Sequence, residues 1–195
     1  MPLGAFKAAL MGTAGVSAGA DVVLLSTVTA SSDATVSFTS GIDSTYGEYI
    51  FKFYALNPES SGAFQFQVNA TDGADYNDSA ITSTHIQIYH KEDDSGTALS
   101  YRTAGDQAQG TAFQELQPTC GSGADEAAVG ELHLFNPSST TYVKHWYCQL
   151  NSYTGTYMQS SLTAGYINDT TAIDDIQFKF ASGDFDGKIK MWGVK

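Results

Sequence analysis

The stretch Tyr49–Ala70, Tyr-Ile-Phe-Lys-Phe-Tyr-Ala-Leu-Asn-Pro-Glu-Ser-Ser-Gly-Ala-Phe-Gln-Phe-Gln-Val-Asn-Ala, decides the fold class of this chain. Apolar residues occupy every second position on both sides of a central turn: Tyr49, Phe51, Phe53 and Ala55, then Phe64, Phe66, Val68 and Ala70. Because successive side chains of a strand point to opposite faces, this period of two predicts two half-buried strands. Asn57-Pro58 ends the first strand, since proline lacks a ladder N–H, and Ser60-Ser61-Gly62 completes the turn. We therefore predict a β-hairpin with an aromatic inward face and an amide-rich outward face.

Apolar and polar residues also alternate in other segments, so we expect roughly nine to eleven short strands in all. The segments concerned are 21–29, 34–39, 84–89, 98–102, 112–116, 131–135, 142–150, 176–180 and 187–192. Lysines alternate with apolar residues in 187–192, as in an exposed or edge strand. Segment 152–157 reads as a loop. Turns rich in Gly, Asn, Asp and Ser separate the strands, so we predict an all-β antiparallel β-sandwich. A jelly roll is the favoured topology and an open barrel the alternative.

A second Asn-Pro turn, Asn136-Pro137-Ser138-Ser139, echoes Asn57-Pro58-Glu59-Ser60 at a spacing of 79 residues. The echo predicts a second hairpin. It is consistent with two equivalent hairpins, one in each half of a sandwich. Coincidence is the alternative, because Asn-Pro turns are common.

Residues 1–20 precede the first strand pattern, so we divide the chain into an N-terminal arm (1–20) and a β-sandwich domain (21–195). The large apolar side chains of the arm are Leu3, Phe6, Leu10 and Met11. Burying each contributes roughly 1.5 to 3 kcal/mol, whereas ordering each backbone residue costs about 1 to 2 kcal/mol. These four residues therefore form a candidate interface with a neighbouring subunit or a larger assembly. A frayed terminus is the alternative.

The composition excludes several classes of partner. A net charge of −12 argues against nucleic acid and anionic membranes, which both need clustered Lys and Arg. No apolar run reaches the ~20 residues of a membrane-spanning helix. Cys120 and Cys148 are expected to be unpaired thiols, and pairing is the alternative.

The sequence contains no pattern that predicts catalysis, a cofactor or a metal site. Its acidic residues gather in turns, where Asp bonds the local backbone. The weak candidate for Ca²⁺ is the loop with Asp72, Asp75 and Asp78, which lacks the twelve-residue pattern and closing Glu. The four histidines have no zinc-binding spacing, and His85 and His90 fall on opposite strand faces. We therefore expect a non-enzymatic protein.

Aromatic residues concentrate in 142–147 and 153–157. Exposed rings of this kind can stack on sugars, but aromatic rings in a sandwich more often belong to the core. Both interpretations remain open at this point.

Two segments resemble small β-rich virion proteins of tailed bacteriophages, particularly those of marine bacteria. They are Phe38–Pro58 and Ile176–Val194, and the second carries the pattern Ser-Gly-x-x-x-Gly-x-(Ile/Phe)-Lys-(aliphatic)-(aromatic)-Gly-(aliphatic). The resemblance implies a capsid decoration (cement) protein on the exterior of the virion. Such a protein would bind the major capsid protein, as a trimer at a threefold position. A receptor- or carbohydrate-binding module of a phage tail or head fibre is the alternative.

Overall fold

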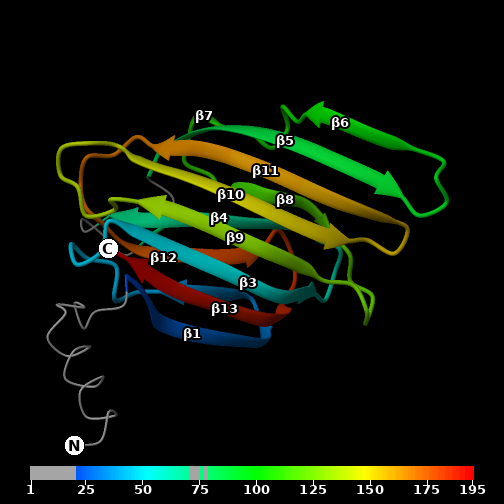
Figure 1. The fold of residues 1–195 in the computed structure, drawn as a ribbon, viewed down its shortest axis with the longest axis horizontal. Helices are drawn as coiled ribbons and strands as arrows, with labels where there is room; N and C mark the ends of the chain where they lie inside the picture. The colour runs from blue at the N-terminus through cyan, green and yellow to red at the C-terminus, as the bar shows by residue number, and fades with distance from the viewer. Residues whose placement is uncertain (1–20, 71–74, 77–78) are drawn as a thin grey trace, which may run out of the picture.

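The computed structural model describes residues 21–70, 75–76 and 79–195, and this part of the chain is all-β. Its strands form two antiparallel sheets (Figure 1). The large sheet contains, in spatial order, β1 (Val22–Asp33), β13 (Phe185–Val194), β3 (Glu48–Pro58), β9 (Ala128–Phe135), β10 (Lys144–Tyr153), β11 (Tyr157–Ile167), β5 (Ile81–Lys91) and β6 (Thr97–Tyr101), and β7 (Ala108–Gly110) also pairs with β5. The small sheet contains β2 (Thr35–Phe38), β12 (Ile173–Phe180), β4 (Gly62–Ala70) and β8 (Gln114–Cys120).

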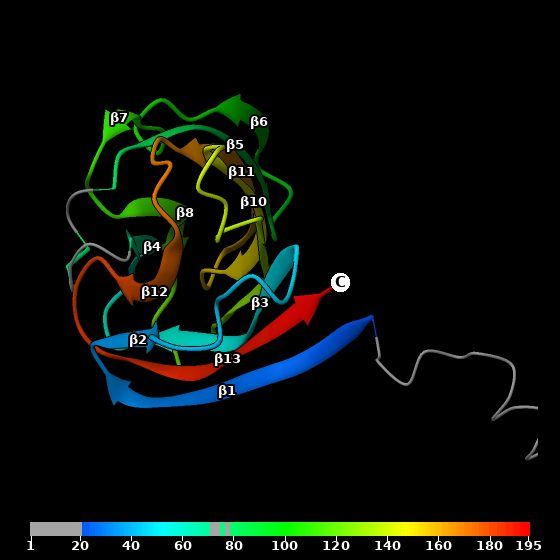
Figure 2. The ribbon, with the colours of Figure 1, turned by 90° about the vertical axis from the view of Figure 1, so that its left-hand side faces the viewer.

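The two sheets face each other as a sandwich, which confirms the predicted fold class. In Figure 2 the large sheet curves from β1 and β13 round to β5 and β6, with the small sheet on its inner side. The outer face of the large sheet is therefore an extended surface that no other described element covers.

One half of the interior is an aromatic core, and Phe178 of β12 lies at its centre. Its ring centroid is 5.2 Å from that of Phe53 and 5.4 Å from that of Phe51, both of which belong to β3 in the opposite sheet. Phe64 of β4 stacks on Phe178 within the small sheet, with 5.9 Å between centroids. The alternation read from Tyr49–Ala70 is thus correct in placing these rings inside.

The other half of the interior is polar, because amide and hydroxyl side chains lie between β8 and the strands β10, β11 and β5. Ser83 donates a hydrogen bond to Oε1 of Gln114 at 2.7 Å. The Gln117 amide donates to Oγ of Ser152 at 2.5 Å, and the Thr163 hydroxyl donates to a β8 carbonyl at 3.3 Å. These side chains are fully or almost fully buried. Polar groups therefore lie among apolar residues such as Leu116 and Leu150 under this part of the large sheet.

The predicted hairpin at Tyr49–Ala70 is wrong, because β3 and β4 belong to different sheets. Asn57 and Pro58 end β3, and the corner directly after them carries the chain across the sandwich to β4. Asn57 anchors this corner by donating from its side-chain amide to the carbonyls of Gly123 (2.9 Å) and Glu126 (2.6 Å). The amide-rich face is also misplaced in part, since Gln67 is fully buried and donates to Thr111 O at 3.0 Å.

The second Asn-Pro turn does join a hairpin, because β9 and β10 pair directly in the large sheet. Asn136 has a φ of 45°, in the left-handed region that asparagine tolerates better than most residues. The two Asn-Pro turns therefore have different roles, and they are not equivalent hairpins.

Two further expectations need correction. Strand β11 was not predicted, because its inward side chains are Gln159, Ser161 and Thr163 and give no apolar alternation. Strand β13 is not an edge strand, since it lies between β1 and β3. Its lysines do point to the exposed face, as expected.

Both cysteines are free and buried, as predicted. Residues 1–20, with Leu3, Phe6, Leu10 and Met11, lie outside the described residues. In the described part, no helix is long and apolar enough to cross a membrane.

Candidate functional site

The outer face of the large sheet carries the most extensive candidate site. Outward side chains alternate with core residues along β3, where Ile50, Lys52 and Tyr54 point out and Phe51 and Phe53 point in. Cross-strand pairing continues this face across the neighbouring strands. The surface combines aromatic rings, aliphatic side chains and a few charges.

Tyr54 stands between two shallow hollows on this face. One hollow of about 410 Å³ is bordered by Lys52, Val129 and Asn151. The other, of about 360 Å³, is bordered by Lys188 and Lys190. The Tyr54 ring is 42% exposed, and the Nζ of Lys190 lies 5.3 Å from its centroid. A planar ring between two hollows lined by amide and ammonium donors can stack on and hydrogen-bond to a polar partner.

Two glycines shape the sheet beside these hollows. Gly130 has a φ of 154°, and a Cβ built there would lie 2.2 Å from the Gln149 carbonyl oxygen. Gly187 has a φ of 141°, and its Cβ would lie 2.9 Å from the Ala55 carbonyl oxygen. The pairing registers of β3 with β9 and with β13 shift beside these glycines. The hollows therefore coincide with bulges that only glycine accommodates.

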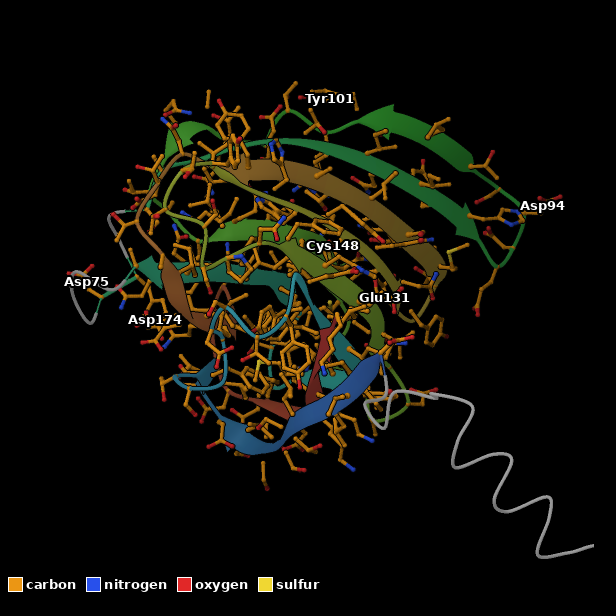
Figure 3. All side chains as sticks on the ribbon, turned by 60° about the vertical axis from the view of Figure 1, so that its left-hand side comes forward. Asp75, Asp94, Tyr101, Glu131, Cys148 and Asp174 are labelled. Carbon is orange, nitrogen blue, oxygen red and sulfur yellow. The ribbon has the colours of Figure 1, made fainter. Side chains whose placement is uncertain are left out.

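A histidine between two glutamates lies next to the first hollow. Nδ1 of His133 is 2.5 Å from Glu48, and Nε2 is 3.1 Å from Glu131. Glu131 also pairs with Nζ of Lys52 at 3.3 Å, and Figure 3 labels it on the large sheet. Partial burial raises the pKa of Glu131, but the hydrogen bonds from His133 and Lys52 outweigh this and hold that pKa below its usual value.

The Tyr147 ring stacks on His133, with 4.4 Å between centroids and 12° between planes. The imidazole is thus held by two carboxylates and a ring, which fixes its orientation. We interpret this group as an ion-pair network that rigidifies the face. In the part of the chain that the structure describes, no group of three or more His, Cys, Asp and Glu side chains is arranged to hold a metal.

A third hollow, of about 700 Å³, lies at one end of the sandwich, beside the β9–β10 turn. Three aromatic rings line it, from Tyr46, Phe135 and Tyr142, and His145 also lines it. Tyr142 is 74% exposed, and its backbone N–H donates to the Ser139 hydroxyl at 3.0 Å. The aromatic cluster read from 142–147 is therefore divided: Trp146 belongs to the core, and Tyr142 faces solvent.

The thiols and the turn acids have structural roles. Burial raises the pKa of the Cys120 thiol to about 12, and burial likewise raises the pKa of Cys148. Thiols of this kind stay protonated and are poor nucleophiles at neutral pH. Asp43 accepts a hydrogen bond from Thr45 N at 2.8 Å, as expected for a turn aspartate.

Of the calcium candidates, Asp72 and Asp78 lie outside the described residues.

Sequence reasoning missed Tyr54 as a site residue, because it treated the Tyr49–Ala70 alternation as a guide to the core alone. The signal was present, since a tyrosine on the polar side of a strand is exposed when the other side is buried. His85 and His90 do fall on opposite faces, as expected: His85 is fully buried and His90 is exposed.

No protein-family model matches this sequence, and a search of curated proteins gives no match.

Proposed function

We propose that this chain is a non-enzymatic bacteriophage virion protein that decorates the capsid exterior. In this proposal it binds the major capsid protein and stabilises contacts between capsomers. The observation that carries the proposal is the long outer face of the large sheet, which joins apolar side chains, Tyr54 and three lysines on one exposed surface. The resemblance of Phe38–Pro58 and Ile176–Val194 to phage virion proteins supplies the biological setting.

The strand order supports a jelly-roll topology for this sandwich. The order β1-β13-β3-β9 in the large sheet faces β2-β12-β4-β8 in the small sheet, so the chain crosses repeatedly between two four-stranded layers. This order supports the eight-stranded arrangement of a jelly roll, a fold common among viral capsid proteins. The remaining strands, β5 to β7 and β10 with β11, extend the large sheet on one side. Fold resemblance alone does not fix function, so it counts only as support.

Charge also favours the large sheet as the docking face. The chain has a net charge of −12, yet this face carries Lys188 and Lys190 beside the Lys52–Glu131 ion pair. An acidic protein with a local basic cluster can dock on a shell while its acidic loops face solvent.

Two matched lysine variants test this docking face. Lys190 of β13 lies near the Tyr54 ring on the large sheet, and Lys179 of β12 lies 4.2 Å from the Phe113 ring centroid on the small sheet. Lys190→Glu should weaken binding to isolated capsids of the encoding phage by at least about tenfold. Lys179→Glu, which makes the same charge change, should leave binding within about twofold.

Equal binding by both lysine variants and the unmodified protein would remove the large sheet as the docking face. Quantitative mass spectrometry of purified virions tests the wider proposal, which requires hundreds of copies per particle. A few tens of copies at most would indicate a tail or fibre component instead.

The second candidate is the receptor- or carbohydrate-binding module, which the hollow beside the β9–β10 turn favours. Tyr46, Phe135 and Tyr142 provide rings for stacking on a sugar, and His145 provides a hydrogen-bonding group. Titration with bacterial surface oligosaccharides, monitored by protein NMR or calorimetry, tests it. Binding that Tyr142→Ala abolishes would support this candidate, and an absence of binding across the panel would reject it.

A further inference from the structure

Strand β6 ends the large sheet, and one side of its backbone is unpaired within the described chain. The N–H of Arg102, just after the strand, donates to His85 O of β5 at 2.8 Å. Because backbone direction alternates along a strand, the N–H and C=O groups of Thr97, Leu99 and Tyr101 point away from β5. The strand Thr-Ala-Leu-Ser-Tyr has no charge and no proline, which are the usual means of protecting an edge.

A cluster of exposed apolar side chains covers the outer face beside this edge. Pairing places Ile86 opposite both Leu162 and Tyr101, and Ile88 opposite Leu99, so these residues share one face. We call the following residues the β6 patch: Ile86, Ile88, Leu99, Tyr101, Met158 and Leu162. Leu99 is 73% exposed and Tyr101 is 54% exposed. All six are among the exposed large hydrophobic residues of the described chain, and a contiguous apolar patch of this kind marks an interaction surface.

The opposite edge of the sheet, β1, differs from β6. The register of β1 with β13 shifts twice, and Ser32 has a φ of 52°. Irregularities of this kind twist an edge and discourage further pairing. The pairing of β6 with β5 has no shift along its length. The regular, uncharged edge is therefore the one next to the apolar patch.

We propose that two copies of this chain associate through β6, edge to edge and antiparallel, so that their large sheets become one continuous sheet. With Leu99 on the two-fold axis, Thr97 of each copy pairs with Tyr101 of the other. The two β6 patches then meet across the new strand pair. Leu99 and Tyr101 of each copy lie beside this seam, and the pairing satisfies the free N–H and C=O groups of both edges.

The charges favour the antiparallel arrangement. The acidic turn with Asp93 and Asp94 follows β5 at one end of β6, and Tyr101 lies at the other end (Figure 3). Antiparallel pairing keeps the acidic turns of the two copies at opposite ends of the interface. Parallel pairing would bring these turns together, at a cost in repulsion. A two-fold pair differs from the trimer implied by the resemblance, and it does not depend on the capsid role.

Sedimentation equilibrium of the full chain tests the pairing. At concentrations up to about 100 μM, which populate weak specific complexes, the protein should reach twice its chain mass of 20.8 kDa. Leu99→Asp should raise the dissociation constant at least about 100-fold, because the new carboxylates of the two copies would face each other at the two-fold axis. Thr97→Pro should also weaken pairing, since it removes an N–H on the free edge and no bond to β5.

Leu24→Asp is the matched control, because Leu24 is 44% exposed on β1 at the opposite edge of the same sheet. This variant should still dimerise like the unmodified protein. Thermal unfolding of each variant reports whether it remains folded. A monomer or trimer for the unmodified chain would overturn the proposal, as would dissociation caused by Leu24→Asp and not by Leu99→Asp. Capsid binding is measured separately, so failure of the pairing is distinguishable from failure of the proposed function.

Discussion

Phe178→Ala should be among the most destabilising single substitutions in this chain. Phe178 is fully buried, and its ring contacts aromatic rings of both sheets: Phe38, Phe51, Phe53, Phe64 and Phe66. Removing a buried phenylalanine ring costs about 3 to 5 kcal/mol, which includes the cavity left behind. Because five neighbouring rings hold each other in place, the site collapses poorly, and we expect about 4 to 5 kcal/mol.

Urea unfolding at 25 °C, followed by tryptophan fluorescence and circular dichroism, measures this loss. For a domain stabilised by about 5 to 15 kcal/mol, it would shift the midpoint strongly or unfold the protein. Phe178→Leu, which retains most of the volume, should cost less than about 1.5 kcal/mol. Tyr54→Ala on the exposed face should cost less than about 1 kcal/mol. A loss below about 2 kcal/mol for Phe178→Ala would refute the view that this ring joins the sheets.

Three further predictions follow from backbone, histidine and cysteine positions. Gly130→Ala should lower the free energy of unfolding by at least about 2 kcal/mol, because its Cβ would overlap the neighbouring backbone; Gly96→Ala, whose Cβ would be 3.7 Å from the nearest side-chain atom, is the urea-unfolding control. Burial lowers the pKa of His85 in the folded state, so the unfolded state takes up the proton first as the pH falls. Stability should therefore decrease with acid below about pH 6.5, less steeply in His85→Gln, and an unchanged slope in that variant would contradict this role. Cys120 and Cys148 should resist thiol reagents at pH 8 in the native protein and react after unfolding; rapid native labelling would contradict their burial.

Local sequence patterns predicted the strands with apolar inward faces and failed where the interior is polar. Val36 and Phe38 of β2 and Phe178 of β12 are buried as their alternation indicated. Strand β11 escaped prediction because its buried Gln159 and Thr163 look like surface residues in sequence. A hydroxyl group can be buried when a partner is present, and the partner of Thr163 is the Leu116 carbonyl of the distant strand β8.

The candidate site was predictable only in part. The rings around Tyr142 were recognised as a candidate for sugar binding, and Tyr142 is exposed beside a hollow. The site at Tyr54 was not, because it needs β3, β9, β10 and β13 side by side. Its hollows also depend on close backbone approach at Gly130, which a one-dimensional pattern does not contain.

The sequence alone determined the strand periodicity and the aromatic content of the core. It also determined that the chain has a low fraction of charged residues and an acidic net charge. These follow from side-chain alternation and composition, which are local properties of the chain. The tertiary structure alone decided the sheet to which each strand belongs. Identical Asn-Pro signals became a corner between sheets at Asn57 and a hairpin turn at Asn136. The reason is that strand pairing is a contact between residues far apart in the chain. The carbonyls of Gly123 and Glu126 that hold Asn57 lie more than sixty residues away.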